Sequence, residues 1–255
     1  MTFIIIIVLI VSLLVIAIIV NAIQQHKKKV ETEIRSEIAK QKSIVDYTEN
    51  TIMATQQIPV TQRLLFILHR RVFNALKGMQ LLNPGIMDIG QRIRITEEML
   101  KEIKVDQAPP PEEAFQLPSN DKQVIQFIKG IKNMRTLLRS EHRKSHVDRK
   151  TFESEDKLLE RMQLRSNVDT LMRRGEASLA AHQLGSARQS MEKAIAALAS
   201  QPNPDDYIIA RKGELEDQLR NIRDSLRNAN SNDVLKKQES ERDEIDELFG
   251  DKKKW

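Results

Sequence analysis

The sequence predicts an all-α fold, in which one transmembrane helix at the N-terminus leads through a helical stalk into helical hairpins. Three observations support this. Residues 3–20 are almost entirely apolar, while only 40% of the whole chain is hydrophobic and 30% is charged. Beyond residue 23, Leu, Ile, Met, Ala, Glu, Lys, Arg and Gln dominate, and these residues favour helices. Glycine and proline number only 8 each and aromatics make up 4%, which argues against sandwiches and barrels built from turns and strands.

The first element, residues 1–23, is expected to be a membrane anchor. Residues 3–20 read FIIIIVLIVSLLVIAIIV, in which Ser12 is the only polar residue. At ~1.5 Å per residue, roughly twenty residues span the ~30 Å apolar core of a bilayer. The alternative is a cleavable signal peptide, but the stretch has no basic start, shorter apolar core or small-residue cleavage site. His26 and the three lysines that follow it place the N-terminus outside and the remaining chain in the cytoplasm. We expect a single-pass protein of a bacterial inner membrane.

Residues 24–58 are expected to form a helical stalk. Apolar and small polar residues recur there at steps of four and three, which is a weak heptad stripe. The stripe consists of Ile34, Ile38, Gln41, Val45, Thr48 and Ile52. It predicts either a short parallel coiled coil that makes a homodimer or a single helix that packs back on the body.

Residues 59–105 are expected to form a helical hairpin. Pro59 ends the stalk, and a clean 3.6-residue period predicts a helix over 61–82. Asn83-Pro84-Gly85 is a turn signal, and a second helix is expected over 86–105 with Ile89, Ile93, Met99, Leu100 and Ile103 inward. Three consecutive prolines then make residues 106–119 a semi-stiff, exposed linker.

Residues 120–230 are expected to form an all-helical domain, followed by a charged tail over 231–255. Asn120 is a candidate cap for a helix that buries Val124, Ile125, Ile128, Ile131, Leu137 and Leu138. The pattern leaves open whether one helix or two span residues 121–183. Further helices are expected over 186–199 and 205–228, separated by Pro202 and Pro204. A loop is expected at 228–233, which reads NANSND.

Residues 171–198 read LMRRGEASLAAHQLGSARQSMEKAIAAL, with small residues at Gly175, Ala177, Ala187 and Ala194. Small residues let two antiparallel helices approach closely. This segment resembles a tetratricopeptide repeat, and the resemblance implies a scaffold that binds proteins or peptides without catalysis. Two positions depart from the family pattern: His182 stands at the usual turn glycine, and Pro202 lies three residues beyond the usual closing proline. An ordinary pair of packed helices is the alternative.

No motif points to catalysis, a cofactor or a metal. The chain has no cysteine, which excludes thiol catalysis, disulfides and thiolate metal sites. His142 and His146 would share one helix face as a possible metal pair, but Arg139, Arg143 and Lys144 surround them with positive charge. No nucleophile elbow or phosphate-cradling glycine loop is present. We expect that the protein is not an enzyme and that it needs neither a cofactor nor a metal.

Two segments are candidates for contacts with partners. Residues 121–150 contain nine Lys and Arg against three acidic residues, a balance suited to nucleic-acid phosphates or to an anionic membrane leaflet. The basic candidates are Arg70, Arg71, Arg139, Arg143 and Lys144. In the tail, Ile245, Leu248 and Phe249 lie among acidic residues, a pattern typical of peptides that dock into grooves. The tail could equally fold back on its own chain.

The sequence therefore predicts a membrane-anchored cytoplasmic scaffold or adaptor, with residues 3–23 in the membrane and an unidentified protein as its partner. A homodimer through the stalk is possible. The alternative function is a membrane-tethered protein that binds nucleic acid through residues 121–150, and this is less favoured. These two functions differ in their response to salt, because phosphate binding weakens steeply between 50 and 200 mM.

Overall fold

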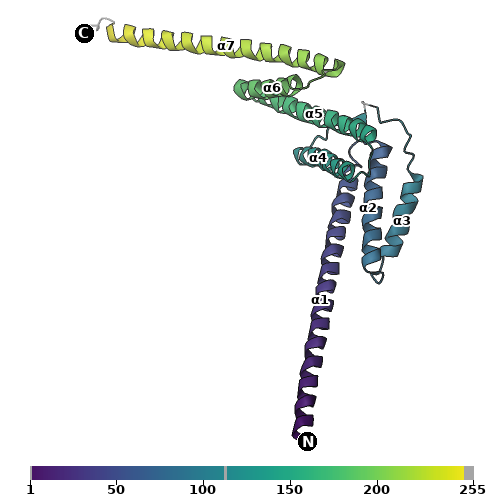
Figure 1. Ribbon diagram of the computed structural model, residues 1–255. Helices are drawn as coiled ribbons and strands as arrows, with labels where there is room; N and C mark the ends of the chain where they lie inside the picture. Colours follow the sequence, from purple (N-terminus) through teal and green to yellow (C-terminus); the bar gives the residue numbers. More distant parts are fainter. Residues whose placement is uncertain (1, 112–113, 250–255) are drawn as a thin grey trace. The chain divides into compact units, whose positions relative to one another are not determined.

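The computed structural model describes residues 2–111 and 114–249, except for the side chains of residues 2–12, 14, 15, 229, 233, 240 and 242–249. Helices are the regular elements in these ranges, as the sequence predicts. In chain order they are α1 (Thr2–Ala54), α2 (Gln62–Leu82), α3 (Ile89–Glu102), α4 (Asp121–Arg143), α5 (Arg149–Ala180), α6 (Leu184–Ala199) and α7 (Asp206–Phe249) (Figure 1).

The chain divides into two compact units. Unit 1 combines Met1–Gln116 with Lys129–Lys157, and unit 2 combines Leu117–Ile128 with Leu158–Trp255. Helices α4 and α5 each contribute to both units. The division therefore cuts across the single domain expected over residues 120–230.

Helix α1 runs without a break for 53 residues, joining the expected anchor and the expected stalk in one element. From Ile16 to Glu33 its side chains are exposed, and the N-terminal part extends beyond α2 and α3 (Figure 1). Among the residues searched, which are those that the structure describes, no helix is both long and apolar enough to cross a membrane. The membrane anchor predicted for residues 1–23 returns below as a proposal.

The second half of α1 packs on the hairpin of α2 and α3. Val45 is 1% exposed and joins Val72, Leu76, Met79 and Ile93 in one apolar core. Ile38 and Ile52 pack against the same core. From Ile38 onward, the stripe predicted on the stalk therefore packs on the body of the same chain, which is the second of the two alternatives given above. The homodimer stays a prediction.

The predicted hairpin of residues 59–105 is present. Thr61 caps α2 by accepting a hydrogen bond from the Leu64 amide at 3.0 Å. The Asn83 side chain accepts one from the Gly85 amide in the expected turn, also at 3.0 Å. Helix α3 begins three residues later than predicted, after Asp88 in the left-handed region with φ 71°. Met99, expected to face inward, is 44% exposed.

The proline-rich segment is less exposed than predicted. Phe115 is 6% exposed, and Arg173 donates hydrogen bonds to the carbonyls of Leu117 and Pro118. Burying the large aromatic ring of Phe115 removes apolar surface from water and so stabilises the fold. The segment is therefore anchored at its C-terminal end.

Two helices, and not one, span residues 121–183. Asn120 caps α4 as predicted, accepting from the Lys122 amide at 2.9 Å. The helix ends at Arg143, and Ser145 adopts φ 59° in the connection to α5. Most of the expected buried face is correct, but Ile125 is 65% exposed, while Phe127 and Met134 are buried. A Cβ on Gly130 would lie 2.9 Å from Ile58 Cδ1, so this glycine allows α4 to approach the end of α1.

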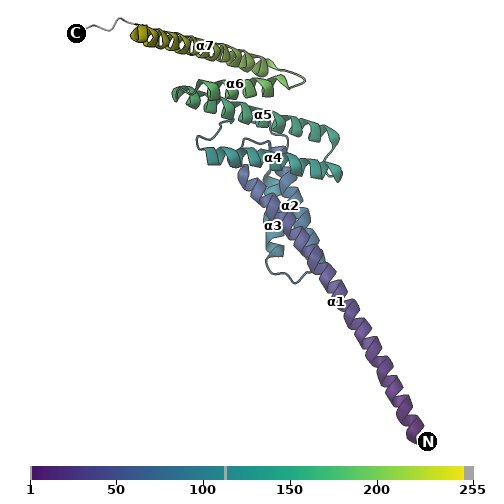
Figure 2. The ribbon, with the colours of Figure 1, turned by 90° about the vertical axis from the view of Figure 1, so that its left-hand side faces the viewer.

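Unit 2 contains α6, α7 and α5 from Leu158 onward, and these helices lie side by side in both views (Figure 2). Its core takes Leu164, Val168 and Met172 from α5, four residues from α6 and four from α7. The turn between α5 and α6 lies just before the predicted Leu184-Gly185, with His182 at φ 56°. His182 therefore adopts the backbone conformation for which the repeat pattern uses glycine.

The loop expected at residues 228–233 is wrong, because α7 continues through it to Phe249. Asn, Ser and Asp disfavour helix interiors only weakly, by well under about 1 kcal/mol each. No proline or glycine interrupts the segment after Gly213. Propensity alone was therefore too weak to end the helix.

Candidate functional site

Arg71, one of the predicted phosphate contacts, lies inside unit 1. Its side chain is 10% exposed and forms an ion pair with Glu141, which is 4% exposed. The Arg71 Nε also donates to Thr48 Oγ1 at 3.2 Å. Arg71 thus links α2 to α1 and α4, and its charge is not available to a ligand. Removing either partner of a buried ion pair would leave the other charge buried without a counter-charge, which lowers the stability of the fold.

Glu141 also contacts His146 and Lys144 in the connection that follows α4. His146 Nδ1 lies 2.7 Å from its second oxygen, and Lys144 Nζ lies 3.8 Å from the first. Burial would raise the pKa of Glu141, but the hydrogen bond with His146 and the charge of Arg71 outweigh it and hold the pKa below its ordinary value. Arg70 donates to the carbonyl of His146. The connection between α4 and α5 is therefore fixed by these contacts.

The suggested histidine metal pair is also used internally. His142 Nδ1 lies 3.0 Å from the Val147 carbonyl, and its ring stacks on Phe152 with centroids 4.4 Å apart. His146 turns to Glu141 instead. No group of three or more potential ligands gathers anywhere in the described parts of the chain.

Arg139 and Arg143 remain on the surface of α4. Arg139 is 53% exposed and lies 3.6 Å from Asp156, whereas the neighbouring Arg135 forms a bidentate pair with the same carboxylate at 2.8 and 2.9 Å. Arg143 is exposed, with no ion pair within residues 2–111 and 114–249. Of the five predicted basic contacts, the structure thus leaves these two and Lys144 exposed.

The tail candidates Ile245, Leu248 and Phe249 lie on the last turns of α7. Their side chains are outside the described residues. Because α7 is one helix, Phe249 stands 40 residues, or about 60 Å, along it from Ile209.

In unit 2, the segment that resembles a tetratricopeptide repeat forms a close helical contact. Gly175 of α5 is buried, and a Cβ there would lie 2.6 Å from Met191 Cε of α6. Ala187 and Ala194 are fully buried in the same core. The small residues singled out by the sequence therefore include those at which α5 and α6 meet.

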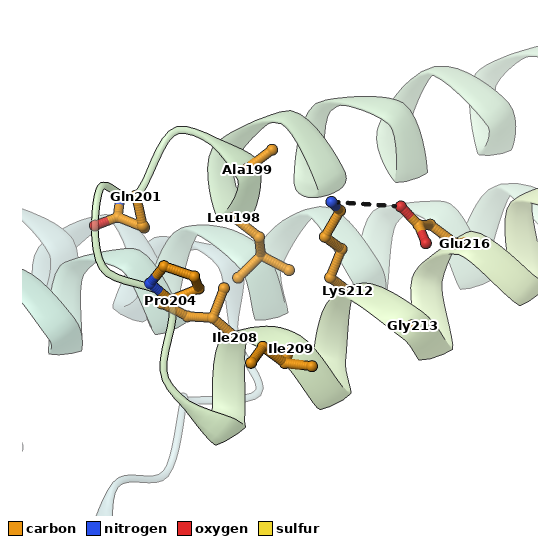
Figure 3. A pocket seen from close by; sticks show the side chains of 9 residues that line it. All are labelled: Leu198, Ala199, Gln201, Pro204, Ile208, Ile209, Lys212, Gly213 and Glu216. Carbon is orange, nitrogen blue, oxygen red and sulfur yellow. Dashed lines mark ion pairs between the residues drawn. The ribbon is translucent and has the colours of Figure 1, made fainter.

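Sequence reasoning missed an apolar groove in unit 2, formed where the end of α6 meets the start of α7. It has a volume of about 460 Å³ and is lined by Leu198, Ala199, Gln201, Pro204, Ile208, Ile209, Lys212, Gly213 and Glu216. Figure 3 shows Leu198, Pro204 and Ile208 along its floor, and Lys212 paired with Glu216 at 3.7 Å beside them. The Ile208-Ile209 pair after Pro204 was the available signal, because α7 can bury only one of two adjacent residues: Ile208 is 6% exposed and Ile209 61%.

Gly213 opens this groove. A Cβ on Gly213 would meet no atom within 4 Å, although glycine inside a helix costs roughly 1 kcal/mol relative to alanine. Among the residues that line the groove, the carboxylate is Glu216, and it is already paired with Lys212.

No protein-family model, curated protein or solved structure matches this chain. The function is therefore argued from its residues alone.

Proposed function

We propose that the protein is a single-pass membrane-anchored scaffold. In this proposal residues 3–23 cross the membrane, the rest of the chain lies in the cytoplasm, and the α6–α7 groove binds a segment of another protein. The observation that carries the proposal is the continuity of α1. One helix connects the apolar segment of residues 3–20 to Val45 in the core of unit 1, so whatever holds the apolar segment also holds the body.

The charges along α1 support the orientation. Lys27, Lys28 and Lys29 follow the apolar segment directly, and no basic residue precedes it. Lysines on the cytoplasmic flank of a span set its direction. The exposed stretch from there to Ile38 then acts as a helical spacer of about 14 Å between membrane surface and body.

The groove supports the scaffold role. Ile209 is 61% exposed beside it, and side chains from two helices form one apolar recess with a charged pair at its edge. Recesses of this kind receive the anchor side chains of partner segments. We take the partner to be another polypeptide, because on a continuous α7 the tail candidate Phe249 stands about 60 Å along the helix from Ile209.

Two experiments test the proposal. After alkaline carbonate extraction, the full chain should stay in the membrane pellet, and a variant lacking residues 2–23 should be released. A C-terminal alkaline phosphatase fusion should be inactive. Release of the full chain, or an active fusion, would refute the anchor or its orientation.

The groove is tested by filling it. Gly213→Leu should block the groove without a clash, whereas Gly185→Leu makes the same change in α6, where a Cβ also meets nothing within 4 Å. A photo-crosslinker at Ile209 should capture a specific protein in the chain with Gly185→Leu and lose it in the chain with Gly213→Leu. Equal capture by both variants would remove the groove from the proposal.

A further inference from the structure

We propose that the outer face of α4 in unit 1 binds the sugar-phosphate backbone of a nucleic acid. Lys129, Lys132, Arg139 and Arg143 follow one another at steps of three, seven and four, so they lie on one face of the helix. All four are exposed. We call these four residues the basic stripe.

The stripe carries charge that the fold does not neutralise. Lys129, Lys132 and Arg143 have no ion-pair partner in the parts of the chain that the structure describes. Between Asp121 and Glu141, α4 contains no acidic residue, and Glu141 is itself buried against Arg71. The opposite face holds Ile131, Met134 and Leu138 in the core, which fixes the direction of the stripe.

The length of the stripe suits a polyanion. Its ends are 14 residues, or about 21 Å, apart. A nucleic-acid duplex carries about one phosphate charge per 1.7 Å of its axis, so roughly twelve phosphates, counted on both strands, lie within this length, and those on one side suffice for four contacts. Contacts of this type hold the backbone and do not read the bases.

The composition of the face argues against a protein partner. From residue 129 to residue 150, no large apolar side chain is exposed, and on this face of α4 only Ile125, one turn before the stripe, is. Protein interfaces rely on buried aromatic or aliphatic anchors for most of their affinity. Phosphate binding does not require apolar anchor residues, because the release of counterions supplies the free energy of binding.

The position of α4 argues against a membrane surface, and this step alone rests on the proposed anchor. Gly130 contacts the C-terminal end of α1, with a Cβ there 3.1 Å from the Cβ of Ala54. Ala54 lies 25 residues, or about 38 Å, along α1 from Lys29. At the other end of the stripe, Glu141 pairs with Arg71, which bonds Thr48, 19 residues or about 29 Å along α1 from Lys29. Even at a helix tilt of about 40°, these two points of α1 stay about 22 Å or more from the surface, beyond the ~8 Å Debye length of physiological salt.

The test uses the full chain in detergent micelles, with fluorescent 30-base-pair DNA and single-stranded RNA of 30 nucleotides as probes in separate arms. Because four phosphate contacts give a salt slope of about −3.6 for a duplex, DNA affinity should fall roughly a hundredfold between 50 and 200 mM salt. K129Q/K132Q/R143Q should reduce the slope by about 3 and the affinity at 50 mM at least tenfold. The RNA arm shows which nucleic acid supplies the backbone.

The control is K42Q/R94Q/K104Q, which removes the same charge from exposed positions on α1 and at α3 and should leave binding nearly unchanged. Failure of both probes at 50 mM salt, or equal loss in both triple variants, would overturn the proposal. The proposal would also fail if the protein bound no nucleic acid but bound vesicles with 30% phosphatidylserine, and if the stripe variant lost that vesicle binding. Binding in micelles depends neither on membrane insertion nor on the groove, so its failure leaves the scaffold proposal standing.

Discussion

At the scale of single residues, unit 1 is joined by polar contacts between positions far apart in the chain. Arg71 and Glu141, 70 positions apart, form a buried ion pair. Thr61 and Glu155, 94 positions apart, share a hydrogen bond of 2.5 Å. Local sequence patterns predict helices and their apolar faces, but they contain no term for such pairs. This is why Arg71 was expected on a contact surface.

Glu155 yields a prediction about pH. Burial raises the pKa of Glu155 above its ordinary value, against the lowering by the Thr61 hydrogen bond and the Arg63 charge. Between the ordinary and the raised pKa, the folded state binds more protons than the unfolded state. Stability from this group is therefore present at low pH and lost as pH rises. Glu155→Gln should match the parent chain in melting temperature near pH 4 and exceed it at pH 7.

The control for this measurement is Glu153→Gln, two residues away on the same helix. Glu153 is 58% exposed and pairs with Arg149 at the surface, where such pairs contribute at most about 1 kcal/mol. Its melting temperature should track the parent chain at both pH values. A lower melting temperature for Glu155→Gln at pH 7 would contradict the destabilising effect assigned to burial.

Gly175 yields a prediction about packing. A leucine there would overlap Met191, whose Cε, Sδ and Cγ all lie within 3.6 Å of the added Cβ. Overpacking of a filled core typically costs about 1–3 kcal/mol, so Gly175→Leu should lower the free energy of unfolding by that amount in a urea titration. Gly185→Leu, which meets no neighbour, should lower it little. A fully stable chain with Gly175→Leu would show that this contact does not limit the approach of α5 and α6.

At the scale of elements, the sequence predicted helices better than it predicted where they end. The bounds of α2 and the cap of α4 were correct because Thr61 and Asn120 satisfy helix amides with their own side chains. The end of the stalk before Pro59 was also predicted, since α1 ends at Ala54, but the end of α7 was not, because the helix continues through residues 228–233 without a proline or glycine. The sequence showed the excess of basic residues in α4. It did not show which of them share an exposed face, because that depends on which residues of the helix the core buries.

The continuity of α7 is a testable property of one element. Since the chain has no cysteine, spin labels can be placed at Asp217→Cys and Glu241→Cys, both exposed on α7. Twenty-four residues of helix should separate the two Cα atoms by about 36 Å. Double electron–electron resonance should then give one narrow distribution of distances between the two labels. A broad distribution would restore the loop predicted at residues 228–233.

At the scale of the whole molecule, the two units hold different proposed roles. Unit 1 contains α1 and the basic stripe, and unit 2 contains the α6–α7 groove. Two apolar clusters, one from α1, α2 and α3 and the other from α5, α6 and α7, share no residue, while α4 buries Ile131, Met134 and Leu138 outside both. Separate cores predict that one unit can lose its packing while the other keeps it.

Truncation of α1 tests this separation. Removing residues 2–23 leaves every described member of both apolar clusters in place, so hydrogen exchange in both units should stay as in the full chain. Removing residues 2–57 also deletes Val45, Thr48 and Thr51, each at most 1% exposed, and uncovers the apolar face of α2. Protection should then fall across residues 62–102 and persist across residues 184–222. If protection fell equally in both ranges, the cores would be coupled, and a partner bound at the groove would alter the stability of unit 1 as well.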